Sequence, residues 1–183
     1  HGVTNFGHPG SYHAPFWKDK TTTYKDVPEG KYLTDQLTDD AVAFLGRADQ
    51  DVPFLLTLFY YGVHTPHQGR EDLVAKYEAR GLVGREAHHA AMVEAVDESI
   101  GRIRRELNEQ GLADDTVLIF FSDQGGWMPN DPLRGSKAGG TALYDGGARV
   151  PLIVTWPGVV KPGSLCDEPV LSTDILPTIV ETA

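Results

Sequence analysis

An acid and an amide stand side by side where an apolar run of the sequence ends. In the segment IFFSDQGG, Asp123 and Gln124 follow the run directly, and Gly125 and Gly126 come next. A carboxylate and a side-chain carbonyl are hard oxygen donors, the ligands that calcium and magnesium require. The same residues also suit a plain turn, in which Asp123 caps the turn and the glycines supply positive φ angles. Both interpretations stay open on these residues alone.

Cations and glycines gather in the following segment, PLRGSKAGGTALYDGGARVP. Lys137 lies in it between Arg134 and Arg149. Its glycines allow the backbone to approach a ligand closely, and they are Gly135, Gly139, Gly140, Gly146 and Gly147. This composition is typical of an anion-binding loop, although the phosphate-binding pattern G-x-x-x-x-G-K-[ST] is absent from it. The alternative is a surface loop with ordinary solvated cations.

A histidine pair follows another apolar run, PFLLTLFYY at 53–61, in the segment GVHTPHQG. His64 could donate a proton or contact an anion, or it could be an exposed loop residue. His67 lies close by, but no further His or Cys completes a zinc ligand set in this stretch. His88 and His89 are expected near the start of a helix, without a role.

The elements that would position these side chains alternate along the chain. Apolar spacing and capping residues predict helices at 33–48 and 85–110 and from Ser172 or Thr173 onwards. Short apolar runs predict buried strands at 53–61, 116–122 and 150–156. The order indicates an α/β fold with a mainly parallel sheet sandwiched by helices. Because ligands bind at the carboxyl ends of such strands, the loops after 61 and 122 are expected at one edge of the sheet.

The composition and net charge of the chain indicate which kinds of ligand it is suited to bind. The chain has 183 residues, a formal net charge of -10 and a single cysteine, Cys166. Such acidity argues against a nucleic-acid surface, which needs clustered Lys and Arg, but not against a small anionic substrate bound at a locally positive site. No apolar run approaches the roughly 18 residues of a membrane span.

Taken in order, several segments resemble the formylglycine-dependent sulfatases of the alkaline-phosphatase-like superfamily. The most specific are SDQGG and PLRGSK…LYDGGARVPLIV, supported by YLTDQLTDDAVAFL, GVHTPHQG and HHAAMVEAVDESIGRI. The resemblance runs from about Gly30 onwards and implies an incomplete alkaline-phosphatase-like fold. We therefore expect 1–183 to be part of a sulfatase catalytic domain, with a loop-rich substrate-side segment at 1–32 and the α/β part at 33–183.

The resemblance implies a role for each matched residue. Asp123 corresponds to a calcium ligand, and Gln124 stands where most members have asparagine, so that its amide oxygen would reach the ion from one methylene further out. Lys137 corresponds to the lysine that holds the sulfate group, and His64 to the histidine that contacts the sulfate or the leaving oxygen. Asp145 replaces a glutamate. Calcium is expected in preference to magnesium.

The family's nucleophile arises from C/S-x-P-x-R, a motif that 1–183 lacks. We therefore expect the formylglycine upstream of this chain, and a fragment that is inactive alone. The expected substrate is a sulfated small molecule or a glycan, and the resemblance is compatible with a periplasmic or secreted protein.

Two other functions remain open on the sequence. A phosphodiesterase or phosphonate monoester hydrolase of the same superfamily would share the sheet, but two-metal members carry additional His and Asp ligands. A non-catalytic module that binds sulfated glycans would share the anion-holding residues, although the acidic net charge argues against a heparin-type surface.

Overall fold

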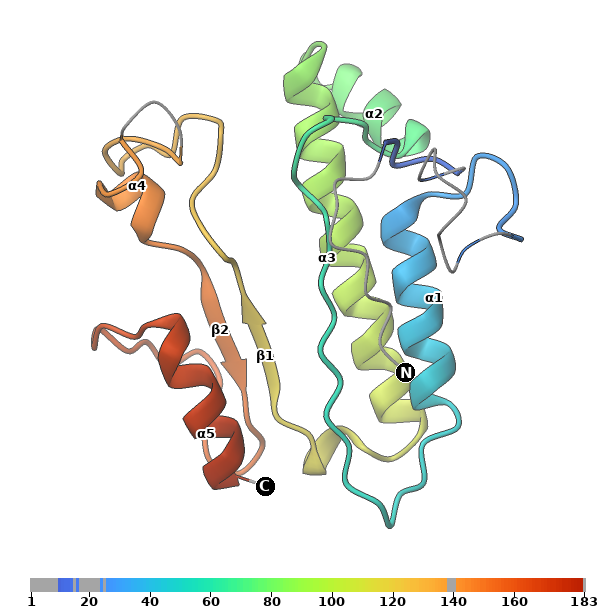
Figure 1. Ribbon diagram of the computed structural model, residues 1–183, viewed down its shortest axis with the longest axis vertical. Coiled ribbons are helices and arrows are strands. Elements are labelled where there is room, and N and C mark those ends of the chain that lie inside the picture. Colours follow the sequence, from blue (N-terminus) through green and yellow to red (C-terminus); the bar gives the residue numbers. More distant parts are fainter. Residues whose placement is uncertain (1–9, 15, 17–23, 25, 138–140, 183) are drawn as a thin grey trace. The chain divides into compact units, whose positions relative to one another are not determined.

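A computed structural model of the chain divides it into two compact units, His1–Gly111 and Leu112–Ala183. The structure describes residues 10–14, 16, 24, 26–137 and 141–182. Figure 1 shows the elements of each unit. That 1–183 forms one partial domain, with a loop-rich segment at 1–32 and an α/β part at 33–183, stays a prediction.

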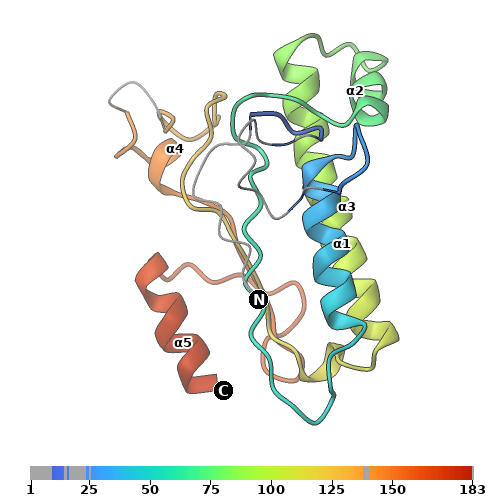
Figure 2. The ribbon, with the colours of Figure 1, turned by 45° about the vertical axis from the view of Figure 1, so that its right-hand side comes forward.

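The first unit is built on a pair of helices that the apolar spacing predicts. Helix α1 spans Leu33–Leu45 and helix α3 spans Arg85–Glu109. They lie side by side and run in the same direction, while the segment between them returns along α3 (Figures 1 and 2). Leu33, Leu45 and Met92 are fully buried, and burying each such side chain contributes about 1.5–3 kcal/mol.

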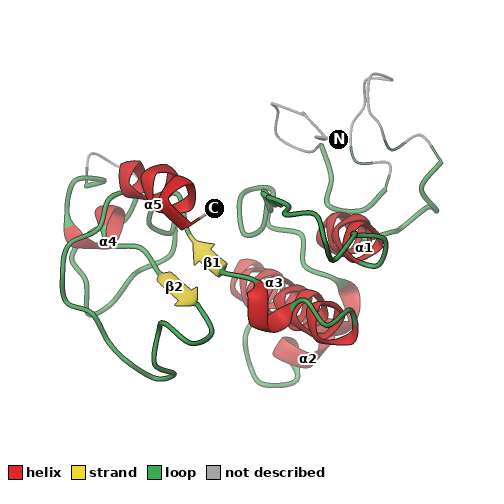
Figure 3. Cartoon of the chain, turned by 90° about the horizontal axis from the view of Figure 1, so that it is seen from below, coloured by secondary structure: helices red, strands yellow, loops and turns green. Residues whose placement is uncertain are grey.

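A glycine lies near each end of helix α3. Gly84 precedes its first residue, and Gly111, with φ of 69°, follows its C-cap Gln110. A left-handed residue after a helix is most often glycine, because a side chain there costs energy. A further helix, α2 at Glu71–Glu78, was not predicted, and it packs against α3 (Figure 3). Its eight residues are too few for apolar spacing to identify it.

The predicted strand at 53–61 is wrong for the described structure. The segment is elongated but has no strand partner among the described residues. Leu58 and Tyr60 pack against the core of the first unit, whereas Leu55 and Phe59 are 66% and 78% exposed. An apolar run supplies the side chains of a strand, but a strand exists only where a neighbour accepts its backbone hydrogen bonds.

The second unit contains a two-stranded sheet. Strand β1 spans Leu118–Phe121 and β2 spans Leu152–Thr155, both within the predicted runs. They pair antiparallel, with Leu118 opposite Thr155 and Phe121 opposite Leu152, so the predicted parallel arrangement is wrong for this pair. A parallel pair needs a long crossover, usually a helix; the connection here has only the four-residue helix α4 at Asp145–Ala148.

The chain closes with a short 3-10 turn, η2 at Ser172–Asp174, and helix α5 at Ile175–Thr182. This confirms the predicted start near Ser172, and Pro177 lies in the first turn of α5, where a missing N–H costs little. Leu176 and Val180 are 66% and 70% exposed. Within the described part of the second unit, no helix packs on the strand pair, contrary to the predicted helical cover. A 3-10 turn, η1 at Ala113–Asp115, precedes β1.

No helix among the described residues is long and apolar enough to cross a membrane.

Candidate functional site

The loop that carries His64 is fixed by a buried tyrosine from the start of the chain. The hydroxyl of Tyr12 lies 2.5 Å from the carbonyl oxygen of Tyr61 and 2.9 Å from that of His64, so its single proton is shared between them. Burial raises the pKa of Tyr12, which keeps this donor protonated. Gln68, further along the same loop, accepts the backbone N–H of Tyr12 at 2.8 Å. Both contacts hold the backbone on either side of the histidine.

The His64 ring is half-buried and oriented by its neighbour. Its Nδ1 lies 3.0 Å from the carbonyl oxygen of Thr65 and 3.1 Å from the Thr65 hydroxyl. A hydrogen bond donated by Nδ1 to that carbonyl fixes the ring and makes Nε2 the nitrogen that exchanges protons with a ligand. This geometry suits the predicted role of a proton donor to a leaving oxygen.

An arginine secures the end of the same loop. Arg70 contacts Asp72 at 2.7 Å, Glu98 of α3 at 2.7 Å and Asp35 of α1 at 3.3 Å. The hydrogen bonds to Asp72 and Glu98 raise the pKa of Arg70. Several ion pairs that share one planar guanidinium restrict its position more than an isolated surface pair does. The loop is therefore tied to both long helices of the unit.

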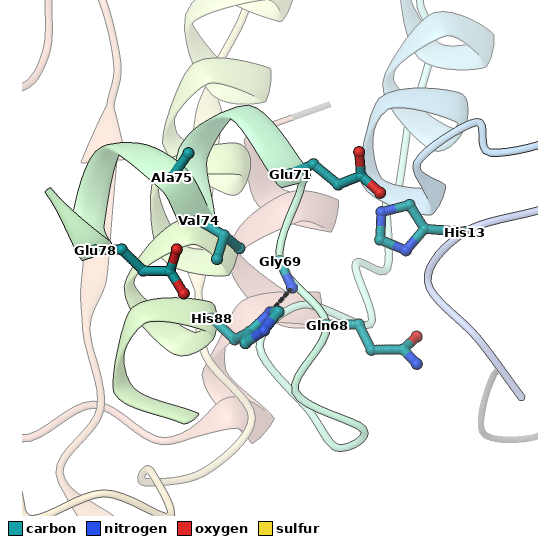
Figure 4. Close-up of a pocket in the computed structure, with 8 residues that line it drawn as sticks. All are labelled: His13, Gln68, Gly69, Glu71, Val74, Ala75, Glu78 and His88. Carbon is teal, nitrogen blue, oxygen red and sulfur yellow. Dashed lines mark hydrogen bonds between the residues drawn. The ribbon is translucent and has the colours of Figure 1, made fainter. Parts of the chain in front are cut away.

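Close backbone packing adds a second constraint on this loop. The backbone N–H of Gly69 donates to Nδ1 of His88 at 3.0 Å, as Figure 4 shows. A Cβ added at Gly69 would lie 2.6 Å from the Cβ of Ala91 and 2.9 Å from the carbonyl oxygen of His88. His88 therefore has a contact that the sequence did not suggest, and Gly69 lets the loop reach α3.

A cavity of about 270 Å³ opens beside this contact. In Figure 4 the side chains of His13 and Glu71 point toward each other across its edge, and Glu78 faces it from the other side of His88. His64 is not among its lining residues, which are His13, Gln68, Gly69, Glu71, Val74, Ala75, Glu78 and His88. The cavity therefore adjoins the histidine's loop without containing a predicted site residue.

His67 lies against another histidine. Its ring centroid is 5.8 Å from that of His89, and its Nε2 is buried without a hydrogen-bond partner in the described structure. Burial and the neighbouring His89 and Arg85 lower the pKa of His67, and burial and Arg85 lower that of His89. Both rings are therefore neutral at pH 7. Among the described residues, no group of three or more His, Cys, Asp or Glu could hold a metal ion.

In the second unit, Asp123 and Gln124 follow the end of β1, and their side chains contact each other. Both side chains are exposed, and the amide Nε2 of Gln124 donates to Oδ2 of Asp123 at 3.4 Å. The Ser122 hydroxyl donates to the backbone carbonyl of Gln124 at 3.1 Å, which fixes the bend between them. The donor set, a carboxylate and an amide oxygen on neighbouring residues, fits a hard cation, and it supplies only part of the six to eight oxygens, roughly, that calcium takes.

Gly125 and Gly126 follow this pair, and they do not supply the positive φ angles that a turn would require. Neither Gly125 nor Gly126 has a positive φ. Instead, a Cβ at Gly125 would lie 2.0 Å from the carbonyl oxygen of Gly146, and the Gly125 N–H donates to the carbonyl of Gly147 at 2.9 Å. Gly125 is thus required for close backbone approach. This removes the main support for the plain-turn interpretation.

The backbone of Lys137 contacts the segment that follows Asp123 and Gln124. Its backbone N–H donates to the carbonyl of Gly126 at 3.1 Å, which brings the lysine next to the chain that follows Asp123 and Gln124. The Thr141 hydroxyl accepts from the Ser136 N–H at 3.2 Å and spans the ends of the loop. Gly139 and Gly140, which the sequence singles out, lie outside the described residues.

The cations near Lys137 differ in their contacts. The Arg134 guanidinium lies 3.8 Å from the ring centroid of Tyr144, and Arg149 pairs with Asp145 at 3.8 Å. The Lys137 ammonium, half-buried, has no ion pair among the described residues. Of these cations, Lys137 has neither an acidic partner nor a ring contact within the described structure, which leaves its ammonium available to an anion.

The structure thus groups Asp123, Gln124 and Lys137 within the second unit, while His64 belongs to the first. A family model described as Sulfatase matches residues 1–183. The chain belongs to the sulfatase family. A protein named Sulfatase from Formosa agariphila is 38% identical to it, covering 84% of this chain and 30% of that protein. Human steryl-sulfatase is 36% identical over 82% of this chain and 26% of its own length.

Solved structures agree with the family. Ps i-CgsB superposes with a TM-score of 0.77 at 34% identity, covering 88% of this chain and 36% of that one. The same protein in complex with k-i-k-neocarrahexaose gives a TM-score of 0.75 at 32% identity, covering 87% and 36%. The predicted fold class, an incomplete α/β domain of the sulfatase type, is confirmed. This chain spans less than a third of the curated relatives named here.

Proposed function

We propose that the full-length protein containing this chain is a sulfuric ester hydrolase. Family membership supports the reaction class, and the contact that carries the proposal is the hydrogen bond from the Lys137 N–H to Gly126. It joins the backbone of Lys137 to the chain that follows the two oxygen donors after β1. The Lys137 cation would bind an anionic sulfate ester group, and the oxygen donors would bind a metal ion.

In this proposal the candidate residues have separate roles in binding and catalysis. Asp123 and Gln124 would hold Ca²⁺, or less favourably Mg²⁺, and the bound ion would supply positive charge to the sulfate oxygens. Lys137 donates hydrogen bonds to the same sulfate group. His64, with Nδ1 engaged at Thr65, gives a proton from Nε2 to the departing oxygen. A formylglycine nucleophile would come from outside these residues, because C/S-x-P-x-R does not occur among them.

Substrates of two kinds remain within the proposal, sulfated small molecules and sulfated glycans. The relatives support both, since one is named steryl-sulfatase and another was solved with a neocarrahexaose.

The first prediction tests the role of Lys137 in the full-length protein. Lys137→Ala should lower kcat/KM for 4-nitrophenyl sulfate by about 10²–10³-fold, because it removes a charged donor from the reacting group. Lys161→Ala removes an exposed lysine of the same unit and should change kcat/KM by less than about twofold. Equal losses in the two variants, or a preference for 4-nitrophenyl phosphate over the sulfate in the wild type, would refute the proposal.

A further inference from the structure

A second cavity lies beside the Lys137 loop. It measures about 320 Å³, and Trp127, Asn130, Asp131 and Ser136 are among the residues that line it. Trp127 directly follows Gly126 and Ser136 directly precedes Lys137, and Gly126 and Lys137 are the residues joined by the 3.1 Å backbone hydrogen bond. The cavity is therefore fixed next to the proposed sulfate-binding cation by the chain itself.

The largest side chain on this cavity is the partly exposed indole of Trp127. Trp127 is 47% exposed and makes no hydrogen bond or ring contact with the described part of the chain. Exposing a large aromatic surface is unfavourable. An exposed indole on the wall of a cavity, beside a proposed reaction site, marks a surface that a ligand covers.

Two polar side chains of the cavity, Asn130 and Asp131, offer hydrogen-bond acceptors. The amide Nδ2 of Asn130 donates to the carbonyl of Gly146 at 2.7 Å, which fixes the side chain and leaves Oδ1 as its acceptor. Asp131 is exposed, and its carboxylate has no cationic partner within the described residues. A ligand that fits therefore brings hydroxyl donors for these oxygens and an apolar face for the indole.

A saccharide ring has this combination, because one face carries polarised C–H groups and its edge carries hydroxyls. Those C–H groups pack against the negative face of an aromatic ring. A steroid skeleton offers the apolar face but no hydroxyl donors at its edge, so Asn130 and Asp131 would lose water without replacement. The Asp131 charge also disfavours a further sulfate group at this position.

We propose that this cavity binds the saccharide ring that carries the scissile sulfate, with Trp127 as its stacking surface. The inference rests on the proposed sulfatase function, and it assigns the substrate class as a sulfated glycan. Trp127 is then a residue that determines specificity for the sugar part of the substrate, separate from Lys137, which binds the sulfate.

The test compares sugar and steroid esters on the full-length protein. The sulfate esters are galactose 4-sulfate, galactose 6-sulfate, N-acetylglucosamine 6-sulfate and dehydroepiandrosterone sulfate. The best sugar sulfate should exceed the steroid sulfate in kcat/KM by about tenfold or more. Trp127→Ala should lower kcat/KM for that sugar sulfate about 10- to 100-fold, and Trp127→Phe should lower it less, because a smaller aromatic face remains. Leu165→Ala, at a position 96% exposed and outside the cavity, should leave it within about twofold.

A binding measurement separates this inference from the proposed reaction. NMR titration should show that Trp127→Ala weakens binding of the sulfate-free sugar by about tenfold while affinity for inorganic sulfate stays within about twofold. If no ester is hydrolysed but sugar binding still depends on Trp127, the proposed reaction fails, and saccharide binding at the cavity stands without a scissile sulfate. A preference for the steroid sulfate, or an unchanged sugar kcat/KM in Trp127→Ala, would overturn the assignment while the sulfatase function stands.

Discussion

At the scale of single residues, two neutral histidines lie together beside the loop of the proposed proton donor. His67 and His89 have ring centroids 5.8 Å apart, and burial is the first cause of the lowered pKa of each. A protonated imidazole at either position would face the other ring and the Arg85 charge. Folding therefore favours the neutral form of both.

This arrangement predicts how stability depends on pH. An unfolded histidine takes up a proton below about pH 6.5, whereas folded His67 and His89 resist it. The unfolded state then binds more protons, so the free energy of unfolding rises with pH up to about 6.5 and levels off above it. Melting temperatures measured by calorimetry from pH 4.5 to 8 should show this rise.

His67→Asn should remove about half of the rise, because one of the two titrating groups is gone. The melting temperature at pH 8, where both rings are neutral, supplies the internal control for lost packing. A slope equal to that of the wild type would contradict the neutral pair.

The residues proposed to bind metal and sulfate were easier to predict than the residues that position them. Asp123, Gln124 and Lys137 stand out by type beside glycines, and a backbone hydrogen bond from Lys137 to Gly126 joins their segments. Tyr12 and Arg70 were missed because their roles depend on backbone carbonyls and carboxylates in distant segments. Gly125 was noticed for the wrong reason: its partner, Gly146, becomes a neighbour only after folding.

At the scale of elements, glycines on the α3 side of the first unit have opposite energetic consequences. Gly69 sits where a Cβ would be 2.6 Å from Ala91 and 2.8 Å from Val74. Gly101 lies inside α3, where the nearest atom to an added Cβ is the flexible end of Arg105, at 3.6 Å. One position has no room, while the other has ordinary contact distance and helical backbone.

Alanine at these positions should therefore act in opposite directions. Gly69→Ala should lower the free energy of unfolding by about 1–3 kcal/mol, because the loop must move away from α3. Gly101→Ala should raise it by about 0.5–1 kcal/mol, because alanine is the better helix former. Urea denaturation measures both, and destabilisation of similar size in the two variants would contradict the described packing of the loop.

Element type was more predictable than element pairing. Helices α1 and α3 and the runs that contain β1 and β2 follow from local apolar spacing, which the chain carries by itself. The direction of β2 relative to β1 depends on the connection between them, and the extended segment at 53–61 depends on a neighbour. The periodicity of a single segment predicts neither the strand direction nor the presence of a strand partner.

At the scale of the whole molecule, an acidic chain carries a locally positive loop. The net charge is -10, yet Arg134, Lys137 and Arg149 lie in one segment of the second unit. Arg134 and Arg149 have aromatic and acidic partners of their own, so the anion site proposed at Lys137 does not depend on a broad basic surface. Such a surface would attract nucleic acid.

Calcium dependence of the full-length protein tests the central claim most directly. Turnover of 4-nitrophenyl sulfate is measured after treatment with EGTA and during a titration with Ca²⁺. Turnover should be lost and then restored, and Asp123→Asn should need about tenfold or more Ca²⁺ than the wild type, because a charged ligand is missing. Asp114→Asn, at an exposed acid of the same unit, should behave as the wild type. Turnover that survives EGTA, with the same Ca²⁺ response in Asp123→Asn, would contradict a metal site at Asp123 and Gln124.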